Sequence, residues 1–187
     1  MAAPNKVTVA DLSGRWRLNR SLSESMEQSF ALQGVPWIAR KVINIADIEL
    51  QYARMPQEDA SAATTLSFKQ TIRPGGFDSK NDYIVDGEKR SATVPIFGPV
   101  NMHCRFAGHG EVPTEFTLGS ELVVSEDDHA ALVEVLNSDI NGWTATTLWG
   151  FEMVNGERRF CKYNTTIKGE KRATAKMVYD YLGTPVV

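Results

Sequence analysis

The sequence has few cysteines, little charge of one sign and no long apolar run. It contains 2 cysteines, Cys104 and Cys161, which do not form a CxxC pair. We expect both to remain thiols in a reducing compartment, with no disulfide framework. The formal net charge of −3 gives no basic field that would attract nucleic acid or an acidic membrane surface, so we expect no nucleic-acid partner.

No stretch approaches the ~20 consecutive apolar residues that a membrane span needs, and the N-terminus lacks the apolar core of a signal peptide. We therefore expect a cytoplasmic protein without integral membrane association. The sequence contains no Walker loop, GxGxxG, GxSxG or HExxH motif. Its three histidines, His103, His109 and His129, lie outside the spacing of any known metal site, so we expect neither metal nor cofactor.

What is present fits a single domain that buries its own core. The chain has 187 residues, of which 42% are hydrophobic, and this is enough for one compact core without disulfides. No linker, repeat or low-complexity tract divides it. We therefore predict one domain over residues 1–187, with frayed ends at 1–10 and 183–187.

The N-terminal third predicts one strand followed by two helices. "SGRWRLNR", residues 13–20, alternates polar and apolar residues with the period of a half-buried strand. A helix should then begin at Ser21, where Glu24 completes a capping box. Gly34 ends this helix, and Pro36 opens a second one in "PWIARKVIN". These signals predict a helix-turn-helix lid over residues 21–44, without the basic charge that DNA binding needs.

After Ile45 the hydrophobic period changes from 3.6 to 2, with turn sequences such as "VNGE" and "KGEK" between the apolar runs. Short antiparallel strands after two helices indicate a closed barrel or a sandwich, and we predict a mainly β fold with one closed barrel of about ten strands. The predicted strands cover residues 45–54, 63–73, 81–86, 90–97, 100–107, 115–124, 130–137, 144–153, 158–168 and 171–181.

A strand with "GRW", two helices joined by "LQGV", then "ARKV" and a run of strands resembles the intracellular lipid-binding proteins, the fatty-acid-binding-protein branch of the calycin superfamily. "ALVEVLNSDINGWTATTLWGFEMVNGERRF" is similar to the late hairpin of that family, and "NTTIKGEKRATAKMVYDYL" to its closing hairpin. The resemblance covers the first 45 and the last 55 residues. It implies a barrel whose cavity binds a small hydrophobic molecule.

The chain departs from this family in two respects. It is longer, with extra residues in "RPGGFDSKNDYIVDGE" and "FAGHGEVPTEFTLGSE", so the barrel is either wider or closed as in lipocalins. Family members that bind fatty acids carry an Arg-x-Tyr clamp on the last strand. Here Tyr179 matches the tyrosine, whereas Met177 replaces the arginine.

A closer likeness is to small fungal proteins of lipocalin-like type, some of which act as cyclases in natural-product clusters. This resemblance implies a cofactor-independent cyclase or isomerase, of the pericyclase or Diels–Alderase type, that folds a conjugated substrate in the barrel. The alternative is an intracellular carrier of a fatty acid or another hydrophobic ligand. The sequence leaves the oligomeric state open.

The residues that face the barrel interior decide between a packed core and a binding site. The hairpin resemblance places Cys161, Tyr163 and Thr165 inward, and it places Met177 and Tyr179 beside Tyr163. Two tyrosines and a threonine would give a few polar groups in an apolar cavity. Alternatively, both tyrosines only close the barrel through hydrogen bonds to backbone.

Two further strands leave their inward faces open. "NMHCRFAG", residues 101–108, points one of two alternating sets into the barrel: either Asn101, His103 and Arg105 or Met102, Cys104 and Phe106. The hairpin resemblance points Glu134 inward, where burial would raise its pKa, whereas hydrophobicity alone favours Val133 and Val135.

Trp149 either lines the cavity, where it could stack on a flat conjugated ligand, or covers the outer surface. The candidate catalytic residues are Tyr163, Tyr179, His103 and Glu134. The candidate ligand-binding residues are Phe30, Trp37, Arg105, Trp149, Cys161, Thr165 and Met177.

Overall fold

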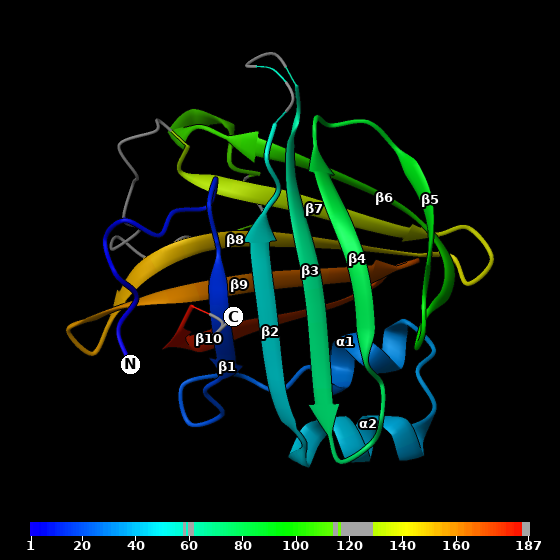
Figure 1. Ribbon diagram of the computed structural model, residues 1–187. Helices are drawn as coiled ribbons and strands as arrows, with labels where there is room; N and C mark the ends of the chain where they lie inside the picture. The colour runs from blue at the N-terminus through cyan, green and yellow to red at the C-terminus, as the bar shows by residue number, and fades with distance from the viewer. Residues whose placement is uncertain (58, 60–61, 114–115, 117–128, 185–187) are drawn as a thin grey trace.

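The computed structural model describes residues 1–57, 59, 62–113, 116 and 129–184. Within them, ten strands and two α-helices form a mainly β structure, as predicted (Figure 1). The elements are β1 Gly14–Leu18, α1 Glu27–Leu32, α2 Trp37–Ile45, β2 Asp47–Arg54, β3 Thr64–Arg73, β4 Ser79–Val85, β5 Arg90–Val94, β6 Gly98–Ala107, a 3₁₀ turn at His109–Glu111, β7 Ala131–Ser138, β8 Trp143–Val154, β9 Glu157–Lys168 and β10 Lys171–Gly183.

The strands form one sheet that closes on itself. Its order is β4-β3-β2-β1-β10-β9-β8-β7-β6-β5, and neighbouring strands in this order are antiparallel. A parallel pairing between Val85 of β4 and Cys104 of β6 closes the ring, which leaves β5 as a strand outside it. Closure removes the free sheet edges and encloses one set of side chains from every second position of each strand.

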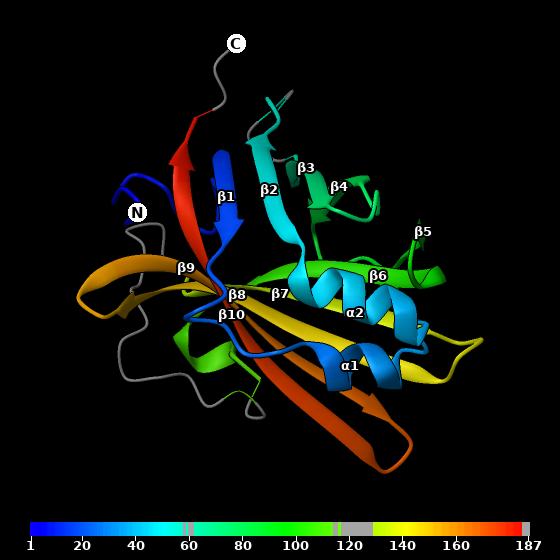
Figure 2. The same ribbon diagram turned by 90° about the horizontal axis from the view of Figure 1, so that it is seen from below.

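The two predicted helices are present, and they lie side by side across one end of the barrel (Figures 1 and 2). Gly34 adopts the left-handed conformation (φ +81°) between them, and Pro36 is the N-cap residue of α2. This confirms the predicted turn, because glycine adopts that conformation without the steric cost that a Cβ adds.

The predicted capping box at Ser21 and Glu24 is wrong, because α1 begins only at Glu27. The Ser21 hydroxyl instead donates to the side chain of Asn19, and the Glu24 carboxylate accepts from the backbone N–H of Lys176 (2.7 Å). The backbone N–H of Glu24 also donates to the Lys176 carbonyl. Bonds to Asn19 and to β10 therefore occupy the groups that would otherwise have capped a helix, and residues 20–22 form a turn instead.

The residues of the "GRW" sequence pack into the part of the barrel core that lies away from the lid helices. Trp16 is fully buried, and its ring lies 5.1 Å from that of Phe160 and 4.8 Å from that of Tyr181. Its indole N–H donates to the Leu12 carbonyl. Gly14 has φ +149°, and a Cβ built there would lie 2.5 Å from the Tyr181 ring, so the close approach of the ring requires glycine.

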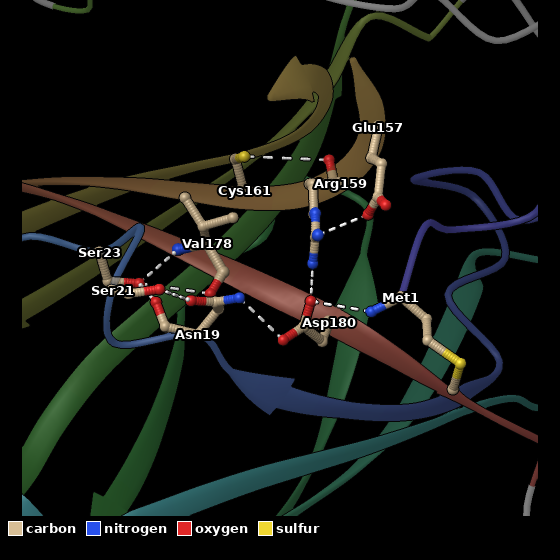
Figure 3. A network of polar contacts seen from close by, with 9 residues as sticks. All are labelled: Met1, Asn19, Ser21, Ser23, Glu157, Arg159, Cys161, Val178 and Asp180. Carbon is tan, nitrogen blue, oxygen red and sulfur yellow. Dashed lines mark hydrogen bonds and ion pairs between the residues drawn. The ribbon is translucent and has the colours of Figure 1, made fainter. Parts of the chain in front are cut away.

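The prediction that residues 1–10 are frayed is wrong. The segment lies against β9 and β10, where the N-terminal ammonium group pairs with Asp180, which also pairs with Arg159 (Figure 3). The buried Arg158 guanidinium donates to the carbonyls of Pro4 (2.9 Å) and Val7 (2.8 Å). Ala3, Val7 and Val9 of this segment also belong to the barrel core. The prediction missed the segment because hydrogen bonds to its backbone carbonyls do not depend on its side chains and so leave no pattern in its sequence.

We expect Arg158→Ala to lower the free energy of unfolding by about 2–4 kcal/mol, because two carbonyls of the N-terminal segment lose a charged donor. The guanidinium also lies 3.8 Å from the Phe151 ring, and that contact would be lost as well. Urea unfolding followed by fluorescence measures the change. The control is Lys171→Ala, at an exposed position of β10, which should change the free energy of unfolding by less than about 0.5 kcal/mol. Equal effects of the two variants would contradict this account.

The predicted strand at 115–124 lies outside the described residues, apart from Phe116. Gly183 belongs to β10 rather than to a frayed end, and residues 185–187 lie outside the described range. In the part of the chain that the structure describes, no helix has the length and apolar character needed to cross a membrane.

Candidate functional site

A cavity of about 580 Å³ lies between the lid and the inward faces of the strands. This volume is within the range that holds a drug-sized small molecule. Its wall is mixed: Phe30 and Ile43 from the lid and Ile48, Phe68, Leu136 and Met177 from the strands give it a large apolar part, and polar side chains such as Gln70, Lys80 and Asn81 line the rest. The fold thus places a site for a ligand with a large apolar part directly under the two helices.

The lid arginines do not point a free charge into this cavity. Arg20 donates to the carbonyls of Ile43 and Ala46, at the end of α2. Arg40 donates to the Val35 carbonyl and pairs with Glu27 (3.1 Å). Both guanidinium groups therefore hold the lid in place.

A buried cation lies at the barrel wall of the cavity. Lys162 of β9 stands directly opposite Trp149 of β8, and its Nζ lies 3.7 Å from the centre of the indole ring. The rings of Tyr52, Phe68 and Phe160 surround the same ammonium group at 5.6–5.9 Å. Aromatic faces attract cations, so these four rings offset part of the cost of keeping the charge away from water.

The surroundings of Lys162 also change its proton affinity. Burial lowers the pKa of Lys162 to about 8, and the neighbouring Glu134 and Cys104 act in the opposite direction. Among the described residues, no carboxylate lies within 4 Å of the ammonium group. At neutral pH the side chain is therefore mostly a cation, and its N–H groups can donate to a ligand.

Glu134 of β7 is the second buried ionisable group of the site. Its carboxylate accepts from the Trp149 indole N–H (3.1 Å) and from the Tyr83 hydroxyl. Burial raises the pKa of Glu134, whereas Lys162 and these two hydrogen bonds lower it. The carboxyl group thus fixes the indole ring on which the Lys162 ammonium group rests.

A row of hydrogen bonds connects this region with the lid. The side-chain amide nitrogen of Asn164 donates to the Thr147 hydroxyl (3.0 Å), and the Thr166 hydroxyl donates to the side-chain oxygen of Asn164 (2.9 Å). The side chain of Gln33, at the end of α1, contacts Thr166 at 3.5 Å. Polar groups of β8 and β9 therefore reach from the cavity to the turn between the helices.

Five of the predicted site residues lie at the cavity or in the core beside it. Phe30 of the lid and Glu134, Met177 and Tyr179 of the strands line the cavity. Trp149 is fully buried in the core cluster beneath Lys162, so it faces inward rather than covering the outer surface.

The predicted inward face of β9 is wrong. Lys162 and Asn164 line the cavity, whereas Cys161, Tyr163 and Thr165 point to the other face of the strand. The Tyr163 hydroxyl donates to Glu152, which also pairs with Lys176 (2.5 Å). Tyr163 therefore belongs to a polar cluster outside the cavity.

On β6 the apolar alternative is the correct one. Met102 and Cys104 belong to the barrel core, so His103 and Arg105 lie on the outer face. The Arg105 guanidinium donates to the carbonyls of Phe106 and Glu111. Trp37, also predicted to bind ligand, is 61% exposed on the outside of α2.

We expect His103→Ala to leave the affinity of the cavity for a small hydrophobic ligand within about twofold of the wild type, since outward-facing substitutions usually change little. Fluorescence titration of purified protein with an environment-sensitive apolar dye measures this. A tenfold loss of affinity would show that the outer face of β6 contributes to the cavity.

Lys162 was not predicted as a site residue, although the sequence carries a signal for it. The turn between β8 and β9 has Asn155 at φ +53° and Gly156 at φ +77°, the usual residues of a two-residue hairpin turn. Such a turn pairs Val154 with Glu157 and, by counting along both strands, Trp149 with Lys162. Opposite residues share a face, so an inward Trp149 requires an inward Lys162.

Among the residues that the structure describes, no group of three or more His, Cys, Asp or Glu side chains is placed to hold a metal ion. The cavity wall brings together the Lys162 cation, the Glu134 carboxyl group and the Tyr179 hydroxyl.

Solved structures decide the fold. A Schistosoma mansoni fatty acid binding protein, determined with arachidonic acid, aligns with 95% of this chain and all of its own chain at a TM-score of 0.57 and 15% identity. A Drosophila melanogaster fatty acid-binding protein from brain tissue aligns with 89% of this chain and 95% of its own at a TM-score of 0.51 and 13% identity. The protein has a fatty-acid-binding-protein-like barrel fold.

Curated sequences similar to this chain include two fungal proteins. The probable pericyclase scpY of Mollisia scopiformis is 28% identical over 186 residues, which cover 97% of this chain and 95% of the relative. The pericyclase pydY of an Acremonium species is 25% identical over 190 residues, with 98% of both chains covered. No protein-family model matches the chain. The similarity thus spans the residues of the lid, the barrel and the cavity.

Proposed function

We propose that this protein is a pericyclase of secondary-metabolite biosynthesis, which binds a hydrophobic conjugated molecule in the barrel cavity and promotes its cyclisation. The observation that carries the proposal is the similarity to two fungal pericyclases over nearly the full length of all three chains. The lid and the barrel are aligned together, so the similarity includes every element that lines the cavity.

The cavity offers a physical basis for such a reaction. In an intramolecular [4+2] cycloaddition, four diene carbons and two dienophile carbons form two C–C bonds, three π bonds become one, and no atom is gained or lost. The main obstacle is to bring the two ends of a flexible chain together, and a preformed apolar cavity lowers this entropic cost. The described wall from Phe30 to Met177 has the shape and apolar character for this role.

Of the predicted catalytic residues, we keep Tyr179 and Glu134, which line the cavity. The Tyr179 hydroxyl lies 3.6 Å from the Met177 sulfur, a weak acceptor that a substrate oxygen could replace. Glu134 acts through Trp149 as a positioning residue.

The fold also favours a second function, that of an intracellular carrier for a hydrophobic ligand. Against the fatty-acid version stand Met177 in place of the clamp arginine and the two lid arginines that are bonded within the lid. Displacement of a fluorescent fatty acid tests the carrier function; a protein that binds it tightly and accelerates no reaction of the linear precursor would be a carrier.

We also propose that the protein acts in the cytoplasm with no nucleic-acid partner. Cys104 and Cys161 are both buried free thiols, which fits a reducing compartment. The net charge of −3 gives no attraction to phosphate backbones.

Deletion of the gene in the source organism, followed by metabolite profiling, tests the proposed function. We expect an uncyclised conjugated precursor to accumulate and the cyclised product to decrease. An unchanged metabolite profile would count against the proposal.

A further inference from the structure

Lys162 is the feature of the cavity that a purely apolar substrate does not explain. Lys162 as a whole is 8% exposed, and its ammonium nitrogen lies 3.7 Å from the centre of the Trp149 ring. The ammonium group forms no ion pair within the described residues. Burying an ammonium group costs free energy that cation–π contacts offset only in part. An apolar ligand would remove the remaining solvent and leave this charge without a partner.

We infer that the substrate is a conjugated chain that ends in an ionised oxygen, such as a carboxylate or an enolate, and that the Lys162 ammonium group binds this oxygen. The inference deepens the proposed function and rests on it. A cation that donates to an oxygen conjugated with the reacting π system withdraws electron density from that system. Lys162 then serves both as the anchor for one end of the chain and as the catalytic hydrogen-bond donor.

The groups that face Lys162 are compatible with an anion at this place. They are Glu134 from β7, Cys104 from β6, Tyr52 from β2, Tyr83 from β4 and Tyr179 from β10. Burial raises the pKa of Glu134 and of the Cys104 thiol, which disfavours negative charge on either group. The hydroxyl of Tyr52 has no hydrogen-bond partner among the described residues, so a further donor lies in the same core.

Two matched fluorescent probes test the inference: cis-parinaric acid, a conjugated tetraene with a carboxylate, and its methyl ester. A charge-assisted hydrogen bond contributes about 1.5–3 kcal/mol, so the wild type should bind the acid about 10- to 100-fold more tightly than the ester at pH 7. In Lys162→Met the preference should disappear while the affinity for the ester is kept. The control is Lys168→Met, because Lys168 is exposed at the end of β9, and this variant should keep the preference.

The pH dependence gives a second readout. The carboxylate of the probe is ionised throughout this range, whereas Lys162 loses its proton as pH rises through its pKa of about 8. The preference for the acid should therefore be full below pH 7 and should decline above pH 8 in the wild type and in Lys168→Met, whereas Lys162→Met should show no preference at either pH.

Equal binding of acid and ester by the wild type, failure to bind the acid, or a preference that survives in Lys162→Met would each overturn the inference. The cyclisation rate of the isolated precursor is measured separately, which keeps the two proposals apart. Cyclisation without any preference for the acid rejects only the role of Lys162. A preference for the acid without cyclisation rejects the pericyclase function.

Discussion

Met177→Trp is expected to lower kcat/KM for cyclisation at least about 100-fold while the barrel remains folded. Met177 lies on the inward face of β10 and lines the cavity together with Tyr179. The residue is only partly buried, so a larger ring extends into the open volume rather than into packed core. The substrate then loses the space in which its two reacting ends meet.

The matched control for this variant is Thr174→Trp on the same strand, where the side chain is exposed and points away from the cavity. It should keep kcat/KM within about twofold. Circular dichroism and a thermal melt establish that both variants fold. Full activity of Met177→Trp would show that the reaction does not take place in this cavity.

Lys162→Met should lower kcat about 100- to 1,000-fold, the usual effect of removing one preorganised donor from a site of developing negative charge. The wild-type kcat/KM should also fall as pH rises through about 8, because the ammonium group of the ligand-free protein loses its proton there. The variant has no such group, so its remaining activity should not change over this pH range.

The same substitution is expected to raise the free energy of unfolding by about 1–3 kcal/mol at pH 7. Methionine has a similar volume to lysine and needs no hydration in this aromatic environment. The pKa of Lys162 is lower in the folded barrel than in the unfolded chain, so folding of the charged form costs free energy at pH values below 8. A purely structural role for Lys162 predicts the opposite, namely a less stable variant with unchanged kcat.

The lid and most of the strand positions were predictable because local signals determine them. Gly34 and Pro36 mark the turn between the helices, and turn residues separate the strands. The capping box at Ser21 was a false signal, because β10 binds that segment instead. Hydrogen bonds to backbone carbonyls, such as those of Arg158, leave no pattern in the sequence of the segment they hold.

The inward faces of the late strands were harder to predict, since both faces are buried. Val133 and Leu148 on the outer side of the barrel pack against Val112 and Phe116 of the β6–β7 connection. Hydrophobicity therefore favours the wrong face of β7, because Val133 and Val135 pack in this outer cluster while Glu134 lies inside. The register of the Asn155–Gly156 turn carries the missing information, and it places Lys162 inside.

The most direct test of the central claim is the rate at which purified protein converts the linear precursor, isolated from the deletion strain, into the cyclised product. The account predicts a saturable acceleration over buffer that is absent with heat-denatured protein and strongly reduced in Met177→Trp. A rate equal to that in buffer, from protein that still binds cis-parinaric acid in its cavity, would contradict it.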